Sequence, residues 1–163
     1  MVDAGGQALL ALRATGLTIR GNRFEGGFTE SLDLRAGSSD VIENHLSGTA
    51  GTCDICLAGP GTFLAQGNIL LAGGIPGIAV SPTVSIPEPA GVEPFVLPAM
   101  AQTFANIREN VVQDHQRTPV GVGIRIDAVG VGAANVHGTV SADVEDNALY
   151  YNRFGIIVHA AFP

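Results

Sequence analysis

One short pattern, an asparagine flanked by apolar residues, recurs along the chain and restricts the folds that are open to it. The pattern occupies residues 19–24, 41–46, 65–70, 107–112 and 144–149. Its asparagines are separated by 22, 24, 42 and 37 residues. Two intervals match one repeat of about 22 to 24 residues, and the two longer intervals predict insertions within that repeat.

A second pattern, two apolar residues with one residue between them, follows each asparagine at a nearly constant distance. The pairs are Leu32/Leu34, Ile55/Leu57, Ile78/Val80, Ile124/Ile126 and Ile156/Val158. A period of two predicts strands with one face turned inward. Gly77, Gly123 and Gly155 precede three of these strands and predict sharp corners. The repeat therefore consists of a strand, an asparagine turn, a short strand, a corner and the next strand.

A repeat of this length cannot bury its apolar face alone, but copies stacked at the usual strand spacing of about 4.8 Å share one core. The pattern and its spacing resemble the right-handed parallel β-helix repeats of the pectate-lyase-like superfamily, from about Ala8 to the last residue. We therefore expect an all-β chain that forms one right-handed parallel β-helix of about five to six rungs over residues 1–163. Because no capping segment is visible, we expect either a fragment of a longer chain or ends that stack on other copies.

The repeated asparagines are expected to stack as a ladder, in which each side-chain amide bonds to the neighbours above and below it. The ladder would contain Asn22, Asn44, Asn68, Asn110 and Asn147. Asparagine also tolerates the left-handed backbone of a tight turn, which is a second reason to find it there. A role in ligand binding is the alternative.

Two insertions, at about 81–103 and 127–141, break the repeat and are expected to form loops. The first carries prolines at 82, 87, 89, 94 and 98 and many apolar residues. It is expected either to fold back on the wall of the solenoid or to contact a partner or a second subunit. In the second insertion, residues 130–135 are similar to a phosphate-binding loop. No helix pattern and no lysine follow them, which favours a plain glycine turn.

Cys53 and Cys56 have the CxxC spacing of a zinc half-site or a redox pair. The chain has no second cysteine pair and its four histidines are scattered, which argues against zinc. Because side chains alternate along a strand, a disulfide within one short strand would be strained, and we expect free thiols. No metal and no cofactor is positively indicated.

Catalysis on such a solenoid requires polar side chains that converge on one outer face. Between the paired apolar residues the stack contains Asp33, Cys56 (one residue out of phase), Ala79, Arg125 and Ile157. The next outward position contains Arg35, Ala58, Ser81, Asp127 and His159. Arg125, Asp127 and His159 would lie on adjacent rungs within reach of one ligand, and they are the catalytic candidates. We favour the alternative, in which they form exposed ion pairs.

The resemblance implies what these residues would do in an enzyme. In β-helix lyases an arginine removes a proton beside a uronate carboxylate that calcium neutralises, which would make Arg125 the base and Asp127 a calcium ligand. Calcium enters only with this alternative, and no dense acid cluster appears on this face. The two carboxylates of a glycosidase are equally unproven, because Asp33 and Asp127 lie several rungs apart.

Aromatic side chains that could stack on sugars are few, and they gather in residues 150–154. Tyr150 and Tyr151 are consecutive, so one of them must point outward. Together with Arg125 they are the candidates for glycan binding in a shallow groove near the C-terminal end.

Composition restricts partners and location. The chain has eight arginines, no lysine, a net charge of -7 and no basic run, which argues against a nucleic-acid partner. No apolar run reaches the roughly 18 residues of a membrane span, and residues 1–14 lack the basic region of a signal peptide. The compartment stays open, and the resemblance implies an extracellular or cell-surface location.

Three functional hypotheses follow. The first is a non-catalytic β-helix module that contacts polysaccharide or a partner protein. The second, which the resemblance suggests, is a polysaccharide lyase, glycoside hydrolase or epimerase acting on an acidic polysaccharide. The third is a self-assembling rod that associates through uncapped ends or through the apolar insertion at 81–102.

Overall fold

The structure, a computed structural model, contains strands and no helix in the residues that it describes. These residues are 7–26, 30–73, 76–82, 100–116, 121–127, 129–131 and 137–159. Nearly all strand pairs in these ranges are parallel, and the pairing of β11 with β12 is antiparallel. The expectation of an all-β chain with parallel sheets is therefore confirmed.

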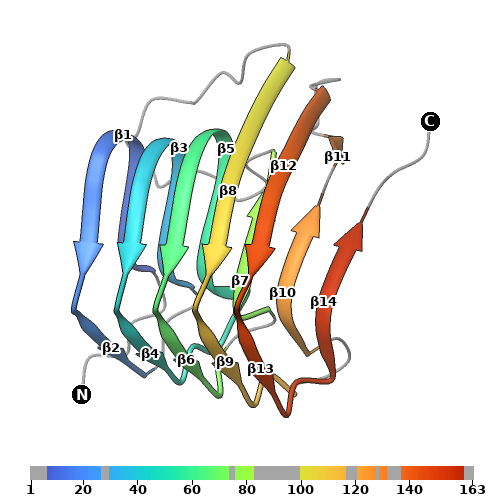
Figure 1. Cartoon of the computed structure of the whole chain (residues 1–163). Coiled ribbons are helices and arrows are strands. Elements are labelled where there is room, and N and C mark those ends of the chain that lie inside the picture. Colours follow the sequence, from blue (N-terminus) through green and yellow to red (C-terminus); the bar gives the residue numbers. More distant parts are fainter. Residues whose placement is uncertain are drawn as a thin grey trace.

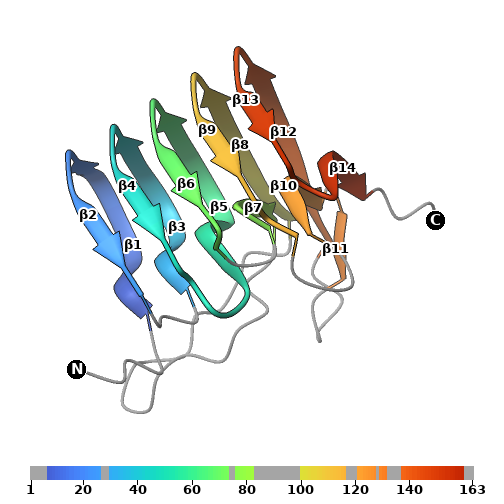
Figure 2. The ribbon, with the colours of Figure 1, turned by 90° about the horizontal axis from the view of Figure 1, so that it is seen from below.

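The strands form two sheets (Figures 1 and 2). The larger sheet contains β1 (Gln7–Arg20), β3 (Glu30–Ile42), β5 (Cys53–Gln66), β7 (Ile78–Ser81), β8 (Met100–Arg108), β10 (Val122–Asp127), β11 (Val129–Val131), β12 (His137–Glu145) and β14 (Phe154–His159). The smaller sheet contains β2 (Arg23–Glu25), β4 (His45–Ser47), β6 (Ile69–Leu71), β9 (Val111–Gln113) and β13 (Ala148–Tyr150).

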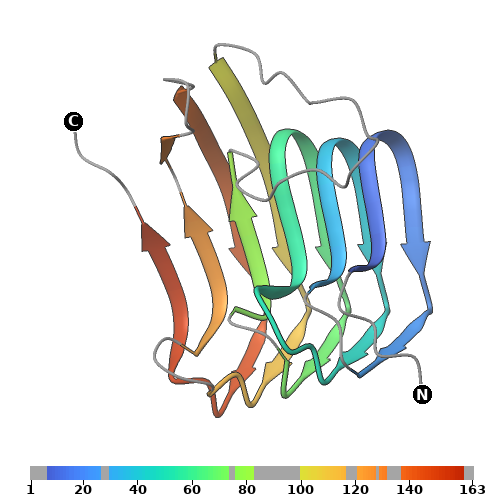
Figure 3. The same ribbon diagram turned by 180° about the vertical axis from the view of Figure 1, so that it is seen from behind.

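The larger sheet bends, so that β1, β3 and β5 each supply two arms (Figures 1 and 3). The bend depends on close backbone contact, because a Cβ on Gly61 would lie 1.8 Å from the carbonyl oxygen of Gly37. In later repeats the arms are separate strands, β7 and β8, then β10 and β12. We call the part of each repeat before the bend its first arm and the part after the bend its second arm. A first arm, the second arm after it and the next short strand together make one rung. The two predicted insertions fall between these separate arms. The second insertion includes β11, and residues 83–99, 128 and 132–136 lie outside the described residues.

Apolar pairs from successive first arms line the interior in register. Leu32, Ile55, Ile78 and Ile124 form one column with Ile156, and the first four are fully buried. The predicted inward pairs are thus correct. One detail of the outer column is wrong: Cys56 pairs with both Asp33 and Ala79, so it lies in phase with its neighbours.

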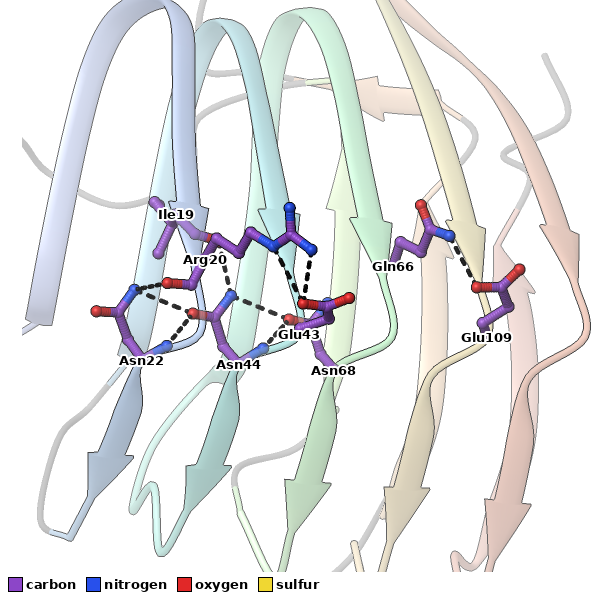
Figure 4. A network of polar contacts seen from close by, with 8 residues as sticks. All are labelled: Ile19, Arg20, Asn22, Glu43, Asn44, Gln66, Asn68 and Glu109. Atoms are coloured by element: carbon purple, nitrogen blue, oxygen red, sulfur yellow. Dashed lines mark hydrogen bonds and ion pairs between the residues drawn. The ribbon is translucent and has the colours of Figure 1, made fainter.

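The predicted asparagine ladder is present (Figure 4). Each asparagine from Asn22 to Asn110 donates its backbone N–H and its side-chain Nδ2 to the Oδ1 of the next asparagine, at 2.9 to 3.1 Å. The left-handed residue is not the asparagine but the one before it. Gly21, Glu43, Gly67, Glu109 and Asp146 have φ between 54° and 67°. This left-handed residue turns the chain just before the asparagine, whose amide is then free to follow the stacking direction.

Candidate functional site

The predicted candidates Arg125, Asp127 and His159 lie together on the outer face of β10 and β14. Arg125 Nε donates to Asp127 Oδ1 at 3.0 Å, and His159 Nδ1 lies 3.7 Å from the same oxygen. Asp127 is half-buried, whereas Arg125 and His159 are exposed. The adjacency follows from the register, which pairs Asp127 with His159.

This cluster is arranged as an ion pair with one carboxylate at its centre. The Arg125 guanidinium already donates to a counter-ion, and exposed pairs of this kind contribute about 0 to 1 kcal/mol. Asp33 lies on β3, three strands from Asp127 on β10. Three strand spacings are roughly 14 Å, well beyond the roughly 5 to 9.5 Å between the carboxylates of glycosidases. Within the described part of the chain, no three His, Cys, Asp or Glu side chains could share a metal ion.

The glycan candidates Tyr150 and Tyr151 lie where β13 ends, and both are exposed, by 52 % and 72 %. Phe154 follows at the start of β14, where the Arg153 guanidinium carbon lies 5.8 Å from its ring centroid. Arg125 lies away from Phe154. It pairs with Ile157, which is three residues beyond Phe154 on β14, or about 10 Å at the usual strand rise. The tyrosines and Phe154 thus lie at the turn between β13 and β14, whereas Arg125 lies with Asp127 and His159.

The C-terminal end of the stack exposes apolar residues that belong to interior columns. Ile156 and Val158 are 49 % and 61 % exposed, although their column neighbours Ile124 and Ile126 are buried. The last second arm and short strand continue this surface with half-buried Val140, Ala142, Val144 and Leu149. We term these six residues the end face. Sequence analysis predicted uncapped ends but not which end is the more exposed.

Sequence analysis missed a buried pair between Asp54 and His115. His115 Nε2 lies 2.8 Å from Asp54 Oδ2, and both side chains are completely buried. Two glycines leave the space for this contact: a Cβ on Gly73 would lie 2.0 Å from Asp54 Oδ1, and one on Gly77 would lie 3.2 Å from His115 Nε2. The corner glycine at 77 is therefore required for close packing, whereas the sequence analysis expected a sharp turn. Substrate cannot reach this pair, so it is structural.

The neighbouring rung places a Ser31–Thr49 hydroxyl pair, 2.6 Å apart, at the same corner. Ser31 is the register equivalent of Asp54, because Glu30 pairs with Cys53 and Leu32 with Ile55. The sequence signal that could have located the Asp54–His115 pair is thus a column of small or polar residues at the corner, read across repeats and not along one strand.

Cys53 and Cys56 form a disulfide, so the expectation of free thiols is wrong. Their Cα atoms are 5.8 Å apart, within the usual range for a disulfide. Alternation fails here because the strand begins at a corner. Asp54 contacts His115 inside the stack and the next residue, Ile55, packs in the core. Two consecutive inward residues leave Cys53 and Cys56 on the same outer side.

Comparisons of the chain with known proteins identify no relative. The chain matches no protein-family model, no curated protein and no solved structure. Among the described residues there is no helix long and apolar enough to cross a membrane.

Proposed function

We propose that the chain is a segment of right-handed parallel β-helix that acts as a non-catalytic binding module. Its contact surface is the end face, and its partner is a protein. Support for the handedness comes from the parallel order of successive strands, since connections between parallel strands of one sheet are right-handed in about 98 % of cases. Support for an extracellular or cell-surface location comes from the Cys53–Cys56 disulfide, which persists in oxidising compartments.

The observation that carries the proposal is the exposure of Ile156 and Val158 in interior columns. Apolar side chains in these columns are otherwise covered by the next rung. Complete burial of such a side chain contributes about 1.5 to 3 kcal/mol, so covering the end face is a substantial driving force for association. Contiguous exposed apolar surface of this kind marks sites of protein contact.

Catalysis is less well supported, because no polar cluster among the described residues combines accessibility with free functional groups. The Asp33–Arg35 ion pair is buried. The Arg125–Asp127–His159 cluster is accessible, but its only carboxylate is engaged by both basic groups. The Asp54–His115 pair is fully buried. A lyase or an epimerase would need Arg125 released from Asp127 when substrate binds.

Site-specific photo-crosslinking in the native cells tests the proposal. Benzoylphenylalanine would replace Val158 on the end face or, as a control, Phe104, which is 49 % exposed on the outer side of β8. We expect a crosslinked protein from position 158 and none from position 104. Equal crosslinking from both positions, or none from position 158, would contradict the proposal.

Polysaccharide binding is a second candidate, and the exposed Tyr150, Tyr151 and Phe154 favour it. Exposed aromatic rings can stack on sugar faces. A glycan array, with and without calcium, tests this function. Selective binding that Tyr151→Ala abolishes and Phe104→Ala preserves would support it, and a blank array would exclude it.

A further inference from the structure

We propose that the outer face of the short-strand sheet docks an amphipathic helix of another protein, with basic residues on both flanks of the apolar stripe of that helix. This surface lies on the side of the stack and not at its end, so the inference goes beyond the proposed function and does not depend on it. We term its outward side chains the side face: Ile69, Leu71, Val111, Ala148 and Tyr150.

The centre of the side face lies on paired, interior strands. β6 pairs with β4 and β9, and β9 pairs in turn with β13, so β6 and β9 each have a strand on both sides (Figure 2). Ile69 on β6 is nonetheless 41 % exposed, whereas the next residue, Leu70, is fully buried in the core. Leu71 and Val111 are half-buried. The exposure of Ile69 therefore belongs to the outer face of the sheet and does not depend on where the stack ends.

The outward residues change in type along the stack. Register places one column in the order Arg23, His45, Ile69, Val111 and Ala148. The second column reads Glu25, Ser47, Leu71, Gln113 and Tyr150. Charged and polar side chains occupy these columns in the first two rungs, so the strands form without apolar residues there. The mainly apolar residues of the last three rungs thus indicate a contact surface.

The dimensions of the side face match those of one helix. Sheets made of parallel strands commonly have both faces covered, often by helices. Three rungs span about 14 Å at the usual strand spacing, and a strand of three residues is about 10 Å long. A helix is about 10 to 12 Å across and rises about 5.4 Å per turn. A helix parallel to the stack would therefore place one turn over each of β6, β9 and β13.

A second copy of the chain fits this surface less well than a helix. The side face covers only about 140 Å² at these dimensions, far below the roughly 800 Å² that each partner contributes to a stable interface. The chain also has no lysine and no basic run that could face an acidic surface. A single helix needs no larger area and is held weakly and reversibly.

Acidic side chains flank the side face. Glu109 and Asp146 precede β9 and β13 on one side, Asp114 follows β9 on the other, and all three are exposed. Glu109 and Asp114 accept hydrogen bonds from glutamine amides, which are neutral and leave the carboxylate charge in place. Arg108 belongs to the neighbouring outer face, where it donates to Gln66. Acids on both sides favour a helix with basic residues on both flanks of its apolar stripe.

Fluorescence polarisation with the whole chain tests the inference. The probe is a fluorescein-labelled, alanine-based helical peptide of about 15 residues, with leucines at the i, i+4, i+7 and i+11 spacing and lysines on both flanks of them. We expect saturable binding that weakens by roughly tenfold in Ile69→Lys, because a like charge then stands in the apolar centre. Phe104→Lys is the matched control, since Phe104 is 49 % exposed on the outer side of β8. It should change the affinity by less than about twofold. Both side chains are exposed, and equal melting temperatures of the two variants would show that the fold is retained.

A second peptide, in which glutamates replace the lysines, tests the charge. We expect it to bind at least about tenfold more weakly, because its flanks would face Glu109, Asp114 and Asp146. Equal binding of the two peptides would overturn the inference, as would no saturable binding of the lysine peptide up to roughly 1 mM. A dimer in sedimentation velocity that Ile69→Lys dissociates would assign the face to a second copy, which also overturns it. Photo-crosslinking from position 158 reports on the end face alone, so either proposal can fail without the other.

Discussion

Ile55 and Ile156 are the same residue type in the same interior column, yet one is fully buried and the other is half exposed. Ile55 has a strand on each side, β3 and β7, whereas β10 is the one strand that pairs with Ile156 in the described part of the chain. The apolar residues of each rung are thus suited to burial, but the neighbouring rung is what buries them. In a stacked architecture of this kind the function of an apolar residue depends on its position along the stack.

The largest expected effect compares these two isoleucines directly. Ile55→Ala should lower the free energy of unfolding by about 2 to 5 kcal/mol, because it opens a cavity between rungs. Ile156→Ala should lower it by less than about 1 kcal/mol, since half of its side chain is already in water. Urea denaturation of both variants measures the difference. Equal losses would contradict the open end.

The second prediction extends the comparison to the asparagine ladder. Asn68→Leu removes the acceptor of Asn44 and the donor to the Val41 carbonyl, all of them buried. We expect a loss of about 2 to 4 kcal/mol. For a chain of this length that loss lowers the melting temperature by roughly 4 to 16 °C. Asn22→Leu, at the exposed end of the ladder, is the control and should lower it by less than half as much. An unchanged melt for Asn68→Leu would remove the ladder from the account.

The third prediction concerns the disulfide, which crosslinks an interior rung. The Cys53–Cys56 bond closes a loop of only four residues, so its removal should cost about 2 kcal/mol. The double variant Cys53→Ser/Cys56→Ser, compared with the oxidised protein in urea, measures this loss. Thiol titration of the denatured, unreduced protein should find no free thiol. Two titratable thiols would show that the bond does not form.

The smallest effect is expected on the outer face. Arg125→Ala removes the exposed partner of Asp127 and should change the free energy of unfolding by less than about 1 kcal/mol. About 1 M salt should erase even this difference, because it shortens the screening length to about 3 Å. A loss of several kcal/mol in the same urea experiment would mean that the cluster has a structural role that its exposure does not suggest.

The repeating features of the fold could be predicted because each is written several times in the sequence. The five asparagines and the apolar pairs recur in the same order in every repeat, and the two insertions show as longer intervals between them. Their neighbours across the stack are therefore fixed as well. The same logic brought Arg125, Asp127 and His159 together on one face. Register, and not any single motif, carries this information.

Features that occur once were missed or wrongly predicted. The Asp54–His115 contact joins residues 61 positions apart and depends on the absence of side chains at Gly73 and Gly77. The disulfide depends on two consecutive inward residues at a corner, where the alternation rule does not hold. One recurring feature was also misplaced, because the left-handed residue precedes each asparagine. In two repeats it is Glu43 or Glu109, a residue type whose propensity does not indicate that conformation.

Amide hydrogen exchange of the free protein tests the open end most directly. Residues 103–113 and 140–150 are equivalent parts of successive rungs, β8–β9 and β12–β13, and the first has neighbours on both sides. We predict slow exchange in 103–113 and clearly faster exchange in 140–150, because no described strand pairs with the outer edge of 140–150. Equal protection of the two segments would mean that this edge is covered in the free protein, and would contradict the account.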